Sequence, residues 1–508
     1  MFGTGFRIGA FRYRGTLAPT GAAAIGFRAF IAQSGGYGSV MNVSYHRLRL
    51  AALPGVLAAM FPVLAYAHAS EQALVLLLPT DVYIMAGAAS VALTVLLLAL
   101  LPHRFAIRCF RPLRVFAIRR TGLHYYTSCV AFALFALLVW AGLTGSRDPV
   151  VNPLPLFVWT VFWVALVSVQ GLLGNIWHWL NPLTGPVAIV RKVFGLRALV
   201  HLNAGVAPWL ALVGFLAFAA FLMADPAPTD PARLARFAAG YWLVMFAAAL
   251  VCGPRWIMRA EAFSVLMTCY GRMGLFGRNR RRLALGLPGW QAFAMRVPSA
   301  GLAVFMLVLL GSGSFDGLNE TFWWLAQLGI NPLEFPGRSA VVSQNIAGLL
   351  IVNAALVAVF SLSVWGGAKL GGSDMGAGRA FRVFAPSILP IALGYHIAHY
   401  LTALLVDGQY VLIAISDPFD TGANFLGLDS FYVTTGFFNT TDTVRVIWLT
   451  QAGAVVAGHI IAIVLAHAIA VREFATARRA VLSQVPLATF MVLYTFFGLW
   501  LLASPRGM

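Results

Sequence analysis

The chain has 508 residues, of which 60% are hydrophobic and only 10% carry a charged side chain. Soluble domains contain about 25% charged residues, so this composition excludes a soluble globular protein and indicates a polytopic membrane protein. The formal net charge is +19, but the basic residues fall between long apolar runs, where membrane topology places them. The charge therefore does not indicate nucleic acid, and the expected partner is the lipid bilayer.

The N-terminal part has the features of a secretory signal. Residues 1–40 are rich in Gly and Arg and contain no spanning run, which leaves open that translation starts at Met41 and that 1–40 is an upstream extension. Residues 41–67 have a basic start, an apolar stretch and an A-x-A pattern that ends at Ala67. Cleavage there leaves His68 at the N-terminus, where its amine and imidazole can chelate copper; alternatively, His68 is simply the first residue after cleavage.

The rest of the chain, 68–508, predicts an all-α bundle of about ten transmembrane helices. The predicted spans are 82–101, 123–143, 156–175, 203–223, 236–252, 297–313, 344–365, 384–406, 446–470 and 484–503.

Arginine is concentrated in the predicted loops 102–122 and 253–296, which this asymmetry assigns to the inside. The same asymmetry, with the signal cleaved, predicts that the mature N-terminus and the C-terminus lie on the outer side of the membrane. Two long loops, 314–343 and 407–445, are then outside. Their apolar content predicts ordered rather than free loops.

The eighth predicted span carries two histidines near its middle, His396 and His399. Their i,i+3 spacing places both rings on one face of a helix. Ionisable groups at this depth in a bilayer are costly, and they indicate function by default. Pro390 precedes them and predicts a kink with a free carbonyl nearby.

His459 lies midway along the ninth span, at a depth similar to that of the histidine pair if the two helices run antiparallel. Three imidazoles at one depth are able to bind Zn, Cu or Fe, to hold a haem axially, or to form a proton relay. The structural alternative is that each imidazole only forms a hydrogen bond with a neighbouring helix.

Carboxylates of the outer face are the remaining candidates for the site. Asp407 follows His399 by just over two helical turns and faces a similar direction. Asp417 and Asp420 belong to the segment SDPFDTG, whose composition is typical of turns and which follows the histidine helix. The alternative is that these acids are ordinary solvated loop residues.

Several segments resemble the bacterial membrane proteins known as fenitrothion hydrolases, and the similarity extends over nearly all of 68–508. These segments are HASEQALVLLLPTDVYIMAG, GNIWHWLNPL, FDGLNETFWWL, PSILPIALGYHIAHYL, SDPFDTGANFLGL and AGHIIAIVLAH. The resemblance implies hydrolysis of a lipophilic organophosphorus triester at its aryl P–O bond, with release of a nitrophenol, and a second subunit. It brings no established catalytic residues to this chain.

Triester hydrolysis needs an activated water and an electrophile at the phosphoryl group, which a divalent metal such as Zn or Cu supplies. We therefore expect His396, His399 and His459 to act as metal ligands or general bases, with Asp407, Asp417 and Asp420 as catalytic candidates. Two other functions remain open. One is a copper- or haem-binding protein of the cell envelope, and the other is a transporter of a small lipophilic solute.

Overall fold

The computed structural model describes residues 74–102, 104–117, 121–334, 337–419, 421–428 and 431–506. The predicted extension 1–40, the predicted signal 41–67, His68 and Asp420 lie outside the described residues.

Within that part of the chain, 10 helical segments are long and apolar enough to cross a membrane, which confirms the predicted all-α polytopic bundle. Each corresponds to one predicted span. They are built from α3 (Thr80–Leu100), α5 (Leu123–Thr144), η1 (Leu156–Leu166) with α7 (Val167–Leu173), α10 (Ala207–Ala224), α11 (Pro231–Cys252), α15 (Ala300–Leu318), α17 (Val342–Leu370), α19 (Leu389–Ser416), α20 (Thr441–Glu473) and α21 (Ala477–Ala503).

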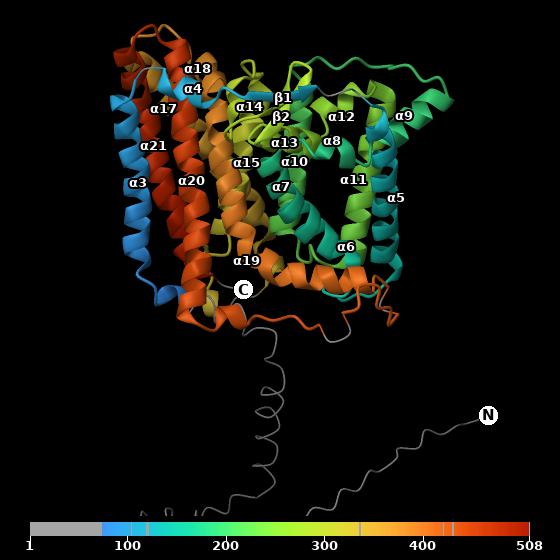
Figure 1. Ribbon diagram of the computed structural model, residues 1–508. Coiled ribbons are helices and arrows are strands. Elements are labelled where there is room, and N and C mark those ends of the chain that lie inside the picture. Colours follow the sequence, from blue (N-terminus) through green and yellow to red (C-terminus); the bar gives the residue numbers. More distant parts are fainter. Residues whose placement is uncertain are drawn as a thin grey trace, which may run out of the picture. The chain divides into compact units, whose positions relative to one another are not determined.

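Short elements cap the spans at the end of the bundle that is uppermost in Figure 1. They include α4 (Phe105–Cys109), α8 (Trp177–Leu180), α9 (Thr184–Val193), α12 (Arg255–Arg259), α13 (Ala262–Gly271), α14 (Trp290–Phe293) and α18 (Ala377–Phe384). A small antiparallel sheet in the order β1-β3-β2 joins β1 (Leu113–Ala117), β3 (Arg282–Leu285) and β2 (Phe276–Asn279).

The sheet fixes which loops share a side of the membrane. β1 comes from the predicted inside loop 102–122 and pairs with β3 from the predicted inside loop 253–296. Thr321 similarly pairs with Arg506 near the C-terminus, so these two segments share an end as predicted. Relative sidedness therefore agrees with the charge-based topology.

The helices that carry the histidines pack on each other through small residues. A Cβ on Gly394 of α19 would lie 2.5 Å from the Ala454 carbonyl oxygen, and one on Gly458 of α20 would lie 2.6 Å from the Pro390 carbonyl oxygen. Glycine at these positions lets the two backbones approach closely, as small residues do between membrane helices. Gln451 of α20 adds a hydrogen bond of 3.0 Å from its Nε2 to the Ala398 carbonyl.

Two helices extend beyond their predicted ends. α15 continues to Leu318 and so takes in the start of the predicted outer loop 314–343. α19 continues to Ser416, so the first residues of the predicted loop 407–445, including Asp407, are helical. In Figure 1 the C-terminal part of α19 turns and runs across the lower end of the bundle.

Pro390 does not kink the middle of a helix. A 3-10 turn, η4 (Ala385–Ile388), precedes α19 and places Pro390 in the first turn of that helix. The first N–H groups of a helix have no intrahelical partner, so proline costs little at this position.

Candidate functional site

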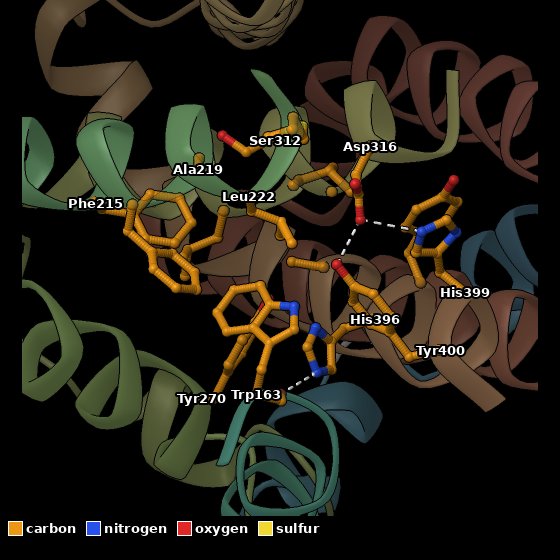
Figure 2. A pocket seen from close by; sticks show the side chains of 17 residues that line it. Trp163, Phe215, Ala219, Leu222, Tyr270, Ser312, Asp316, His396, His399 and Tyr400 are labelled. Carbon is orange, nitrogen blue, oxygen red and sulfur yellow. Dashed lines mark hydrogen bonds and ion pairs between the residues drawn. The ribbon is translucent and has the colours of Figure 1, made fainter. Parts of the chain in front are cut away.

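A small cavity lies in the bundle between α10, η1, α13, α15 and α19 (Figure 2). Its lining is mainly apolar, and we call it the polar cavity for the ionisable side chains among its lining residues. Its volume is about 20 Å³, which is enough for about one water molecule. Both predicted histidines, His396 and His399, line it, together with Asp316 from α15. The i,i+3 spacing of the pair thus brings both rings to one cavity, as predicted.

The centre of this site is a carboxylate held by two side chains of α19. Asp316 Oδ2 lies 3.1 Å from His399 Nε2 and also accepts a hydrogen bond from the Tyr400 hydroxyl. The side chains of His399 and Asp316 are 8% and 15% exposed. A buried carboxylate needs such donors, because an uncompensated charge away from water is very costly.

This contact fixes the tautomer of His399. Since Asp316 is an acceptor, Nε2–H donates to it, and Nδ1 of the neutral ring is then left with its lone pair. Nδ1 is buried and has no hydrogen-bond partner among the described residues. An imidazole oriented by a carboxylate through one nitrogen, with the other nitrogen free, is the arrangement of a general base.

Gly317 of α15 leaves a hollow near that free nitrogen, and the Tyr395 hydroxyl fills it. A Cβ at this position would overlap the Tyr395 hydroxyl and lie 3.7 Å from His399 Nδ1. The rings of Tyr395 and His399 stack with centroids 5.7 Å apart. The Tyr395 hydroxyl also lacks a partner among the described residues. A proton donor and a proton acceptor therefore face the same small space.

His396 is engaged in a different contact. Its Nε2 donates to the main-chain carbonyl of Trp163 at 3.0 Å, and its ring meets the Trp163 indole edge-on at 5.2 Å. Trp163 belongs to η1, which is a π-helix of 11 residues. π-helical turns are rare and frequently mark functional sites. His396 thus ties the histidine helix to an irregular wall of the cavity.

His459 does not share this cavity. Its Nδ1–H donates to the Val455 carbonyl of its own helix at 2.9 Å. The ring centroid lies 6.4 Å from that of Tyr494, whose hydroxyl is 2.6 Å from Ser314 Oγ on α15. Within the described part of the chain, His459 is therefore connected to α15 only through Tyr494 and does not line the polar cavity.

The expected metal does not fit the donors that the structure brings together. Among the described residues, no group of three or more His, Cys, Asp or Glu side chains is arranged to hold a metal ion. His396 and His399 each use Nε2 in a hydrogen bond within the protein. The cavity of about 20 Å³ also has no space for a haem. We therefore derive no step through a metal or a haem.

The acidic candidates of the outer face have other surroundings. Asp407 lies in α19 and lines neither the polar cavity nor the larger apolar one described below. Asp417 accepts hydrogen bonds from the amides of Thr421 and Gly422 at 3.0 and 2.7 Å. The amide of Thr421, above all, holds the pKa of Asp417 below its usual range. Asp417 thus stabilises the turn after α19.

Asp316, the central acid of the site, is not among the residues that the sequence pattern predicted. Asp316 was placed in the outer loop because SFDGLNE reads as the end of an apolar run. The spacing of Gly311, Gly313 and Gly317 nevertheless indicates that the helix continues through Asp316, since small residues at such spacings are typical of packed membrane helices. The partners Tyr395 and Tyr400 neighbour the two histidines along the chain.

Comparison with known proteins does not assign this chain to a family. The sequence matches no protein-family model and no curated protein, and the fold matches no solved structure. The arrangement of the site itself must therefore carry the functional argument.

Proposed function

We propose that this multi-pass membrane protein hydrolyses a lipophilic organophosphorus triester, with His399 as the general base. The observation that carries the proposal is the free, buried Nδ1 of His399, whose opposite nitrogen is held by Asp316. The triester class comes from the resemblance to fenitrothion hydrolases. The water-sized cavity beside the base is compatible with that chemistry.

In this proposal a water molecule in the cavity attacks phosphorus while His399 Nδ1 accepts its proton. The P–O bond to the aryl group breaks, and the nitrophenolate leaves with the bonding electron pair. The imidazolium that forms is stabilised by the Asp316 carboxylate. The Tyr395 hydroxyl is free to donate to the oxygen or sulfur that gains negative charge on phosphorus.

Two further features belong to the proposal. The cavity has space for the water but not for the triester, so substrate binding requires the surrounding side chains to move. We also propose a bacterial inner-membrane location in which the C-terminal segment near Arg506 faces the periplasm, with a second subunit as the resemblance implies.

The test is turnover of a dialkyl nitrophenyl phosphotriester by the full chain in proteoliposomes. We expect nitrophenolate release by the wild type and only background release by His399→Ala. Absence of release from well-folded wild type, with and without added Zn²⁺ or Cu²⁺, would rule out the proposal.

A second candidate, a proton-coupled transporter, is favoured by the series of buried polar side chains across four helices. Beyond the His399 site, the series continues through Ser314 and Tyr494 to His459. Ionisable side chains inside a membrane often mark proton pathways. Flux of an intact solute into proteoliposomes, with proton uptake and without nitrophenolate, would favour this function over hydrolysis.

A further inference from the structure

A second, much larger cavity lies on the other side of η1. Its volume is about 480 Å³, within the range of about 300–1,000 Å³ that is typical of small-molecule sites. It lies between η1 and the pair formed by α5 and α11, and Phe218 of α10 contacts both this cavity and the polar one. The end of α19, which crosses the lower end of the bundle in Figure 1, also contributes to the lining, as does Phe419.

The wall of this apolar cavity is rich in aromatic rings from several helices. Examples are Phe135, Phe157, Phe162, Trp177 and Trp242. Rings of this kind favour flat aromatic ligands, because stacked and edge-to-face contacts add about 0.5–1.5 kcal/mol each beyond the burial of area.

One charged residue, Glu261, lines the cavity, and the charge has no cationic partner among the described residues. Its carboxylate accepts hydrogen bonds from the Tyr241 hydroxyl at 2.5 Å and from the amides of Phe263 and Ser264 at 2.9 and 2.7 Å. Burial raises the pKa of Glu261. A buried carboxylate without a counter-ion is complementary to a protonated amine.

We propose that this cavity is a binding site for a lipophilic aromatic amine, with the aromatic body among the rings and the ammonium group at Glu261. The site is separate from the His399 site and does not depend on the hydrolytic function. We expect such a ligand, which partitions into lipid, to reach the cavity from the bilayer.

The proposal is tested with 1-pyrenemethylamine and the full chain in nanodiscs, by energy transfer from tryptophans such as Trp177 and Trp242 to pyrene. We expect saturable transfer in the wild type. Ala238→Trp fills the cavity from α11 and should weaken binding at least about tenfold, equivalent to ~1.4 kcal/mol. The matched control Val244→Trp, on the same helix at a position that is 61% exposed, should bind as the wild type does.

Uncharged 1-methylpyrene measures the contribution of the carboxylate. It should bind about tenfold more weakly than the amine to the wild type. Glu261→Gln should remove this preference while 1-methylpyrene still binds. Equal binding by Ala238→Trp and the wild type would contradict the proposal that the ligand binds in this cavity. Equal affinity of the two pyrenes for the wild type would contradict the proposal that the ligand is an amine bound at Glu261. Displacement of the probe by dodecylamine at equal or lower concentration would identify a lipid-chain site instead.

Discussion

Asp316 of α15 accepts a hydrogen bond from His399 of α19 over 3.1 Å, inside a bundle of apolar helices. The two residues are 83 positions apart in the chain. The contact orients the imidazole, fixes its tautomer and leaves Nδ1 without a hydrogen-bond partner among the described residues. The proposed function depends on this pair.

Asp316→Asn tests the role of the carboxylate in orienting the base. An amide can present its NH2 group to His399 and so favour the wrong tautomer. We expect hydrolysis to fall by up to about 10⁴-fold, as for an Asp-to-Asn change in a serine-protease triad. Nitrophenolate release in proteoliposomes measures the effect.

The control for this variant is Glu320→Gln. Glu320 is 42% exposed and pairs with Arg338 at 3.4 Å, so its loss should leave turnover within about twofold, because surface ion pairs contribute little. Equal loss of activity in both variants would contradict a specific role for Asp316.

Gly317→Ala tests the hollow beside His399. The new methyl group would overlap the Tyr395 hydroxyl and occupy the space next to Nδ1. We expect at least about a hundredfold loss of turnover, the typical effect of removing a group that stabilises negative charge in the transition state. Gly408→Ala on α19 is the control and should keep wild-type turnover, since nothing lies within 4 Å of a Cβ at that position. Full activity of Gly317→Ala would show that the hollow has no role.

Gly458→Ala tests the close approach of α19 and α20. Its methyl group would lie 2.6 Å from the Pro390 carbonyl oxygen, so the helices must separate. We expect a loss of about 1–3 kcal/mol in the free energy of unfolding, measured by thermal unfolding in detergent. Gly453→Ala, on the same helix with open space around it, should leave stability unchanged or raise it by up to about 1 kcal/mol. An unchanged melting temperature for Gly458→Ala would contradict the packing argument.

The turn after α19 should depend on pH through Asp417. Hydrogen bonding, chiefly from the Thr421 amide, lowers the pKa of Asp417 in the folded state. The stabilisation is therefore complete above the unfolded pKa of about 3.9 and is lost as the pH falls through the lower folded value. Hydrogen-exchange protection of the Thr421 and Gly422 amides, corrected for intrinsic rates, should fall over that acidic range.

In this experiment Asp417→Ala should remove the pH dependence. Asp442→Ala should preserve it, because the Asp442 side chain is 87% exposed at the start of α20 and distant from the turn in sequence. Protection that is unaffected by Asp417→Ala would show that other contacts hold the turn.

Most of the membrane architecture could be predicted because it depends on local sequence. Apolar runs of sufficient length identified the ten spans found among the described residues, and the arginine-rich loops predicted that the segments containing β1 and β3 lie on one side. The small sheet itself was not predicted, since its short strands lie in basic loops without clear alternation.

The site could be predicted only in part. The spacing of His396 and His399 is a property of one helix, so their common face followed from the sequence. The prediction that His459 joins the pair rested only on its depth in the membrane. Depth does not determine which neighbouring helices a side chain contacts. Asp316 was not predicted because a charged residue at the end of an apolar run normally marks the start of a loop. Here the helix continues to Leu318, and its last turns are buried against other helices.

The most direct test of the account compares His399→Gln with His396→Gln. Both exchange an imidazole for an amide at adjacent positions of one cavity, but only His399 has a free ring nitrogen oriented by a carboxylate. Nitrophenolate release should fall to background in His399→Gln and persist in His396→Gln, with both variants folded by thermal unfolding. Wild-type turnover by His399→Gln would contradict the proposal that this residue is the general base.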